Sequence, residues 1–267
     1  MYGFVTGFRT FSGLMYTLKK SLGQHFLRDE NIVAKIIAAL RERAFTQLLE
    51  IGPGGGALTR HLVEIPGIAF KAVELDEEKV RFLENTYPAL KGKIIHDSIL
   101  DIDPPFTGAF TVIGNFPYNI SSQILFKVLE WKDNVEAVTG MFQKEVAQRV
   151  AAKHGNKTYG ILSVLIQAYF EVEYLFEVHE QCFNPPPKVK SAVIRLVPRN
   201  IPLLISDEAF FFTLVKTAFN QRRKMLRNAV RNLFEDTMLK NPIFDKRAEQ
   251  LSVEDFVELS NKGRSKA

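Results

Sequence analysis

Four short, mainly apolar segments between residues 47 and 118 each stop abruptly at glycine or polar residues. They occupy residues 47–51, 70–73, 93–96 and 112–113, and helical patterns lie between them. Short apolar runs that alternate with helical patterns predict a parallel sheet built from strand–helix–strand units. In such sheets ligands bind outside the carboxyl ends of the strands. The residues that follow these four strands are therefore the candidates for a functional site.

The turn after the first strand is rich in glycine. Gly52-Pro53-Gly54-Gly55-Gly56 leads into a helix predicted over residues 58–64. Glycine allows the backbone to approach a ligand without a clash from a Cβ atom. Taken alone, the turn matches the G-x-G-x-x-G/A fingerprint of dinucleotide-binding proteins, so an NAD-dependent dehydrogenase is one interpretation. No acid–base pair suited to hydride transfer is evident, which disfavours that interpretation.

The second and third strands end in carboxylates. Glu74 follows the second strand, 22 residues after Gly52, and a carboxylate at this place can accept both hydroxyl groups of a ribose. Asp97 and Ser98 follow the third strand, where a carboxylate can accept a hydrogen bond from an adenine amino group. Each residue alone could belong to a solvated turn. Together with the glycine-rich turn, they predict a nucleoside site.

The fourth strand runs into Asn115-Phe116-Pro117-Tyr118. The side-chain oxygen of Asn115 and the backbone carbonyl of Phe116 can each accept one N–H. Pro117 fixes the turn, and Tyr118 can stack on a ring. These groups could together bind the exocyclic amino group of a flat heterocycle, although four residues alone could also form an ordinary turn.

Composition limits the remaining choices. The 267 residues are 46% hydrophobic and 24% charged with a net charge of +5, which predicts a globular chain of one large domain or two unequal ones. No apolar run reaches the ~20 residues that span a bilayer, so no membrane role is expected. Cys182 is the only cysteine, which excludes an internal disulfide and favours a reducing cytoplasm. Residues 1–17 have no regular period and are expected to form an extension outside the fold.

Strand–helix alternation stops at Pro198, and helical periodicity continues to the end. Helices are predicted over residues 207–219, 222–234 and 252–261. Six basic residues and no acidic one lie from Lys216 to Arg231. On one helix, Arg223, Arg227 and Arg231 would form a stripe. Such a stripe is often only a solvated face, but its single sign favours contact with RNA phosphates.

The motifs taken together resemble the S-adenosylmethionine-dependent ribosomal RNA adenine N6-dimethyltransferases. The matching stretches are Gly23–Leu27, Glu50–Gly56, Glu74, Asp97, Asn115–Tyr118 and Phe183–Ser191. Residues 143–149 and 159–164 and the basic tail resemble the bacterial small-subunit group, whose loss gives kasugamycin resistance, more than the relatives that confer macrolide resistance. One departure is Phe116, where the family usually has Leu. Because the backbone carbonyl accepts the hydrogen bond there, the change should be tolerated.

The resemblance implies a fold and a set of site residues. The fold is α/β: a Rossmann-like class I methyltransferase with a doubly wound, mostly parallel seven-stranded sheet over residues 18–198, followed by an all-α RNA-binding domain over 199–267. His25 and Leu27 would line the methionine end of the cofactor, with Gly52 and Gly54 beneath it. The remaining assignments are Glu74 to the ribose, Asp97 with Ser98 to the adenine, Asn115 between cofactor and target, Phe183 over the target base opposite Tyr118, and Lys188, Lys190, Arg222, Arg223, Lys224, Arg227 and Arg231 to RNA.

The implied activity is transfer of two methyl groups to N6 of each of two adjacent adenosines near the 3′ end of 16S rRNA. S-adenosylmethionine would be the donor, no metal would be needed, and a cytoplasmic monomer would act on the assembling small subunit. A non-catalytic RNA-binding assembly factor and a large-subunit rRNA dimethyltransferase are the alternatives. Methylation of pyrimidine C5 would need a cysteine nucleophile. Cys182 adjoins Phe183, but the fourth strand end carries no cysteine, which favours a lone, partly buried thiol.

Overall fold

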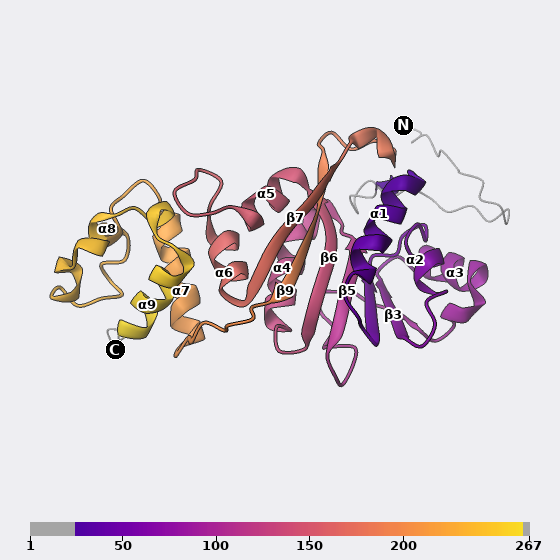
Figure 1. Ribbon diagram of the computed structural model, residues 1–267, viewed down its shortest axis with the longest axis horizontal. Coiled ribbons are helices and arrows are strands. Elements are labelled where there is room, and N and C mark those ends of the chain that lie inside the picture. Colours follow the sequence, from indigo (N-terminus) through magenta and orange to yellow (C-terminus); the bar gives the residue numbers. More distant parts are fainter. Residues whose placement is uncertain (1–24, 264–267) are drawn as a thin grey trace, which may run out of the picture. The chain divides into compact units, whose positions relative to one another are not determined.

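A seven-stranded sheet forms the centre of the first part of the computed structural model, which describes residues 25–263 (Figure 1). The strand order is β4-β3-β2-β5-β6-β9-β7. Strands β2 to β6 pair in parallel, and β9 runs antiparallel to β6. The predicted doubly wound, mostly parallel sheet is therefore confirmed. The strands are β2 (Gln47–Ile51), β3 (Ala69–Glu74), β4 (Ile94–His96), β5 (Phe110–Asn115), β6 (Val135–Gln143), β7 (Phe170–Val178) and β9 (Ser191–Pro198).

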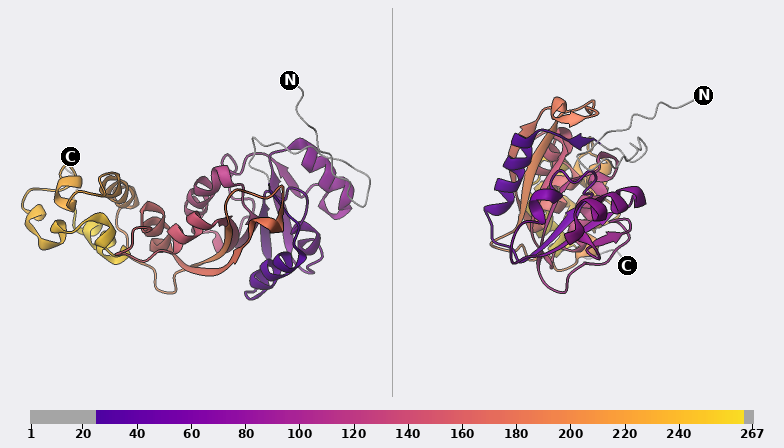
Figure 2. Two further views of the ribbon diagram at one scale, coloured as in Figure 1. Left: turned by 90° about the horizontal axis from the view of Figure 1, so that it is seen from above. Right: turned by 90° about the vertical axis from the view of Figure 1, so that its right-hand side faces the viewer.

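Five helices connect these strands and flank the sheet (Figures 1 and 2). They are α1 (Glu30–Arg41), α2 (Thr59–Leu62), α3 (Glu77–Thr86), α4 (Ser121–Glu130) and α5 (Lys144–Ala151). Helix α1 begins at Glu30, because the Asp29 side chain caps it by accepting hydrogen bonds from the backbone N–H groups of Asn31 and Ile32. Helix α2 is shorter than the predicted 58–64.

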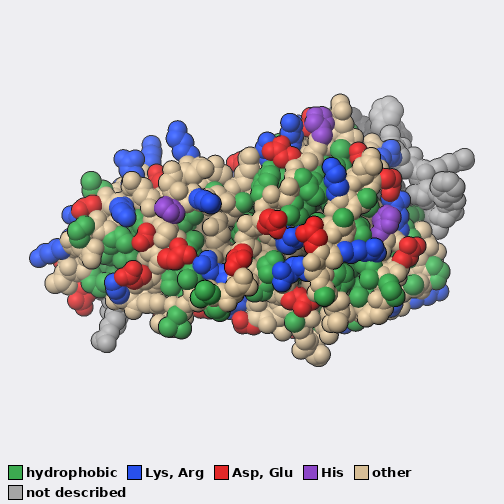
Figure 3. Space-filling view, viewed as in Figure 1, with side chains coloured by type: hydrophobic (Ala, Val, Ile, Leu, Met, Phe, Trp, Pro, Cys, Tyr) green, Lys and Arg blue, Asp and Glu red, His purple; other side chains and the backbone are tan. Residues whose placement is uncertain are grey.

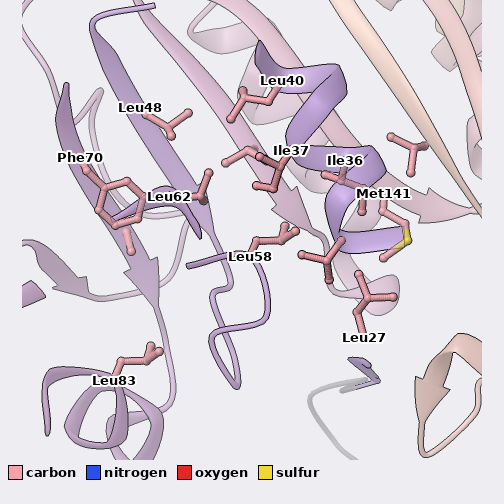
Figure 4. Close-up of a cluster of buried hydrophobic side chains, with 14 of the residues drawn as sticks. Leu27, Ile36, Ile37, Leu40, Leu48, Leu58, Leu62, Phe70, Leu83 and Met141 are labelled. Carbon is pink, nitrogen blue, oxygen red and sulfur yellow. The ribbon is translucent and has the colours of Figure 1, made fainter. Parts of the chain in front are cut away.

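The hydrophobic core explains why the central strands are mainly apolar. Leu48 of β2, Phe70 of β3 and Ile36 of α1 belong to one buried cluster, shown in Figure 4. Strands of a parallel sheet that are covered on both faces bury both sets of side chains. The core holds the carboxyl ends of β2, β3, β4 and β5 in register at one edge.

A second, two-stranded sheet was not predicted. Strand β1 (Phe26–Leu27) pairs antiparallel with β8 (Phe183–Asn184), so that Leu27 lies opposite Phe183. The Arg28 N–H extends this ladder by donating to the carbonyl of Cys182 at 2.8 Å. The small sheet ties the start of the described chain to the segment that precedes β9. The predicted extension over residues 1–17, and Gly23, lie outside the described residues.

The chain divides into two compact units, and each is described by itself. The first comprises residues up to 147 together with 174–196, and the second comprises 148–173 together with 197 onward. The second unit contains α6 (Ile161–Tyr169), α7 (Glu208–Asn220), α8 (Leu226–Ala229) and α9 (Val253–Lys262). Helix α6 joins this unit because it packs against α7 and α9. The sequence-based boundary at residue 198 stays a prediction.

The prediction of a helix over residues 222–234 is wrong. Only the four residues of α8 are helical there, and residues 222–224 form a turn. The Leu226 N–H donates to the Lys246 carbonyl at 2.8 Å, instead of to residue 222 as a continuous helix would require. Leu226 and Val230 are buried. The three arginines therefore do not form one helical stripe.

Candidate functional site

A pocket of about 310 Å³ opens at the carboxyl ends of β2, β3 and β5 and beside the residues that follow β4. This is a typical size and place for a small-molecule site in an α/β sheet. The structure brings together all eight residues predicted to bind the cofactor, and with them the rest of the strand-end tetrapeptide. The predicted residues that line the pocket are His25, Leu27, Gly52, Gly54, Glu74, Asp97, Ser98, Asn115, Phe116, Pro117 and Tyr118.

The glycine-rich turn leaves room for a ligand. Gly52 and Gly54 adopt positive φ values of 67° and 55°, a conformation that side chains other than glycine rarely take. A Cβ atom on Gly54 would lie 3.3 Å from the Phe26 ring, so a side chain at position 54 would narrow the pocket. The Gly54 N–H donates to Glu74 Oε2 at 3.1 Å, which joins two of the strand ends.

Glu74 is held in a fixed orientation by backbone donors. Its Oε1 accepts the Asp76 N–H at 3.0 Å, and its side chain is buried at the pocket wall. Each carboxylate oxygen has a second lone pair, so both oxygens can still accept hydroxyl groups. A fixed, two-oxygen acceptor at this strand end fits the ribose diol of S-adenosylmethionine.

Replacing Glu74 with alanine should weaken S-adenosylmethionine binding by roughly 1–3 kcal/mol, because two acceptors for ribose hydroxyls are lost. Isothermal titration calorimetry on the folded variant measures this loss directly. Glu64→Ala is the control, because Glu64 is an exposed carboxylate that does not line the pocket. Equal affinity of the Glu74 variant and the wild type would remove Glu74 from the cofactor site.

Asn115 is oriented by the chain that covers the pocket. Its Nδ2 donates to the His25 carbonyl at 3.1 Å, which leaves Oδ1 as the free acceptor of the amide. His25 is held in turn, because its Nδ1 lies 2.9 Å from the Pro185 carbonyl. A carbonyl only accepts, so Nδ1 carries the proton. The amide of Asn115 is thus set before any substrate binds.

Tyr118 is also fixed in place. Its hydroxyl group is hydrogen-bonded to the hydroxyl of Ser191, which is fully buried at the start of β9. Burial raises the pKa of the Tyr118 phenol, so the ring stays neutral at physiological pH. Its centroid lies 5.5 Å from that of the His25 imidazole. The sequence predicted Tyr118 but not the role of Ser191.

Phe183, which was assigned to the target base, is buried in the structure. Its side chain is 4% exposed and belongs to the hydrophobic core, beside Leu27 of β1. It does not line the pocket that Tyr118 lines. Its assignment to the target base stays a prediction, and its burial weighs against it.

Two ionisable residues of the pocket were missed. Glu50 on β2 is 2% exposed, and burial raises its pKa to about 8 although Thr59 Oγ1 donates to it at 2.7 Å. Lys79 on α3 is 1% exposed, with its Nζ 5.1 Å from the centre of the Phe26 ring. The available signal for Glu50 was a carboxylate inside an otherwise apolar strand. The sequence carries no comparable signal for Lys79.

The predicted RNA-binding residues differ in how much of each side chain is available. Arg222 pairs with Glu249 at 3.4 Å, and Arg227 pairs with Asp245. Figure 3 shows Lys and Arg side chains projecting from the part of the chain that contains α8. The exposed members of the predicted set are Lys188, Lys190, Arg223, Lys224 and Arg231.

Two further features of residues 25–263 concern cofactors and membranes. Within this range no group of three or more His, Cys, Asp or Glu side chains could hold a metal ion. No helix in the same range is both long and apolar enough to cross a bilayer.

The sheet, the glycine-rich turn and the row of polar strand ends define a class I S-adenosylmethionine-dependent methyltransferase. The chain belongs to the ribosomal RNA adenine dimethylase family, whose model matches residues 15–263. It is therefore a methyltransferase that dimethylates adenine in ribosomal RNA, and the predicted family is confirmed.

Relatives of known name support this assignment along nearly the whole chain. The ribosomal RNA small subunit methyltransferase A of Cytophaga hutchinsonii is 51% identical over 91% of this chain and 96% of its own length. That of Parabacteroides distasonis is 54% identical over 91% and 92%. Among solved structures, a dimethyladenosine transferase from Plasmodium falciparum has a TM-score of 0.72 at 25% identity, covering 89% of this chain and 97% of that one. The 23S rRNA methyltransferase ErmE has a TM-score of 0.68 at 25% identity, covering 89% and 98%.

Proposed function

We propose that this protein adds two methyl groups to N6 of each of two adjacent adenosines near the 3′ end of 16S rRNA in the assembling small subunit. The choice of the small subunit rests on one observation. Over nine-tenths of its length, the chain is 51% and 54% identical to two enzymes that are named for the small subunit. The fold alone does not decide it, because a 23S rRNA enzyme has nearly the same structure. The protein would act as a monomer in the cytoplasm.

The orientation of Asn115 supports a mechanism for the methyl transfer. When bound, S-adenosylmethionine supplies an electrophilic methyl group on a sulfonium. The N6 lone pair of adenine is delocalised into its ring, so the protein must improve a poor nucleophile by position. Asn115 Oδ1 and the Phe116 carbonyl would accept hydrogen bonds from the N6–H groups and direct the lone pair towards the methyl group. The N–C bond would form as the bond between methyl and sulfur breaks, and the alkylated amine would then lose its proton to water. Tyr118 would stack on the base, which has to leave the RNA helix to enter.

The first alternative is a non-catalytic assembly factor of the same fold. The intact set of strand-end residues disfavours it, because RNA binding alone requires neither an oriented Asn115 nor a fixed Glu74. The second alternative is methylation of the large subunit. Relatives of this chain with about 50% identity carry small-subunit names, which favours the small subunit.

The decisive experiment supplies labelled S-adenosylmethionine with small subunits that lack the modification, and separately with large subunits. We expect up to four methyl groups per small subunit, on two neighbouring adenosines located by primer extension, and none on large subunits. Label on large subunits alone would favour the 23S reaction. Absence of label on both, with normal binding, would favour an assembly factor.

The exposed pair Arg223 and Lys224 gives a separate prediction for RNA binding. If both side chains contact phosphates, Arg223→Gln with Lys224→Gln should weaken subunit binding and lower its salt dependence by roughly 0.7–0.9 log units per lost contact. The matched control is Lys91→Gln with Lys93→Gln, which removes the same charge from exposed positions of the first unit. Titrations across salt concentrations measure both slopes. An equal slope for the Arg223/Lys224 variant and the wild type would place recognition elsewhere, for example at Lys188 and Lys190.

A further inference from the structure

Two glycines face each other on the central strands beside the tetrapeptide. Gly114 of β5 is paired with Gly140 of β6. Neither has a positive φ, so backbone conformation does not require glycine at these places. Their common feature is a neighbour: the ring of Phe116 fills the space where both side chains would stand. A Cβ atom would lie 2.5 Å from Phe116 Cε1 at position 114, and 2.2 Å from Phe116 Cε2 at position 140.

Phe116 is anchored from two sides. Its N–H donates to the Met141 carbonyl at 3.1 Å, which continues the pairing of β5 with β6. Its ring is 1% exposed, and its centroid lies 4.8 Å from that of Phe142. Because the ring and the carbonyl belong to one residue, the position of the Phe116 ring affects the position of the Phe116 carbonyl.

We propose that Gly140 is a positioning residue for methyl transfer. By leaving space for the Phe116 ring, it sets the position of the Phe116 carbonyl, which accepts a hydrogen bond from N6–H of the target adenine. This inference rests on the proposed function and adds to it a residue that lies outside the pocket lining.

The two glycines differ in a way that makes the inference testable. At position 140, the nearest atoms to an added Cβ are ring atoms of Phe116 and Phe142. A smaller side chain at position 116 removes the 2.2 Å clash. It also leaves space beside the Phe142 ring, which can then move to relieve its own 2.8 Å clash with the added Cβ. At position 114, an added Cβ would also lie 2.6 Å from the Ile51 carbonyl oxygen, which belongs to the backbone of β2. A smaller side chain at position 116 cannot relieve that clash.

The test compares Gly140→Ala, Phe116→Leu and the double variant, with single-turnover rates on unmodified small subunits. We expect Gly140→Ala to lower the rate about 10- to 100-fold, since misplacing a reacting group by ~1 Å can cost that much. The KM values and the Kd of S-adenosylmethionine should change less than threefold. The rate of Phe116→Leu alone is the reference for the double variant, whatever its value. The double variant should match Phe116→Leu, because the added methyl group then has space.

Gly114→Ala is the control: its loss should persist when Phe116→Leu is added. A wild-type rate for Gly140→Ala would overturn the inference. So would a folded double variant that is slower than Phe116→Leu by the same factor that separates Gly140→Ala from the wild type. If Gly140→Ala does not fold, the double variant decides, since its failure to fold or to reach the rate of Phe116→Leu would also overturn the inference. An inactive wild type would count against the proposed function instead, because the inference concerns differences between variants.

Discussion

Replacing Asn115 with alanine is expected to lower the rate of methyl transfer by about 100- to 1,000-fold, the usual cost of removing one oriented hydrogen-bonding group from a reaction centre. The physical reason is that Asn115 Oδ1 is one of only two acceptors for the reacting amine in the proposed mechanism. Its amide is already aligned, because Nδ2 donates to the His25 carbonyl. Binding of the small subunit should change little, since RNA affinity depends mainly on phosphate contacts.

Single-turnover methylation and filter binding of small subunits separate these two effects for Asn115→Ala. Asn119→Ala is a suitable control, because Asn119 is an exposed amide that lines the same pocket. A rate near that of the wild type would contradict the mechanism. Parallel losses in rate and in subunit affinity would show that Asn115 acts in binding rather than in the chemical step.

Glu50 should make the folded protein less stable as the pH rises. Burial raises its pKa to about 8, against 4.5 for the ordinary side chain. Between these two values the folded state holds a proton that the unfolded chain has released, so the free energy of unfolding falls with increasing pH. Above pH 8 the free energy of unfolding has fallen by its full amount, about 3–5 kcal/mol, at about 1.4 kcal/mol per pKa unit.

Glu50→Gln removes this ionisation and keeps an acceptor for the Thr59 hydroxyl. Without cofactor, its melting temperature should match the wild type near pH 5 and exceed it by on the order of 10 °C at pH 9. Glu64→Gln, at an exposed position of the same unit, should show no such trend. If the melting temperatures of Glu50→Gln and the wild type differ by the same amount from pH 5 to pH 9, Glu50 ionises normally in the folded protein.

The sequence predicted those parts of the structure that follow from local pattern. Continuous apolar runs mark strands buried on both faces, and the residues that end them must gather at one edge of a parallel sheet. Glu74, Asp97 and Asn115 could therefore be assigned to one pocket from the sequence alone, and all three line it. The resemblance supplied their chemical roles.

The missed features depend on contacts between distant residues. Strands β1 and β8 have two residues each, too few to show any period. The helix predicted over 222–234 fails at Leu226, whose N–H is taken by Lys246, 20 residues later. The burial of Phe183 in the core also depends on a distant residue, because Phe183 pairs with Leu27. No local pattern reveals which of several partners a backbone group or an aromatic ring will choose.

The pairing of β1 with β8 determines when this site can be completed during synthesis. Leu27 and Phe183 are neighbours in space but 156 residues apart in the chain. A nascent chain that ends before residue 183 has no partner for β1, although the residues of β2 to β5 have already emerged. Ladders between distant residues form late, because closure of a long loop costs entropy before the contact is gained. The pocket-lining ends of β2 to β5 can thus assemble early, whereas the wall built from His25 to Leu27 has to wait until about two-thirds of the protein has been translated.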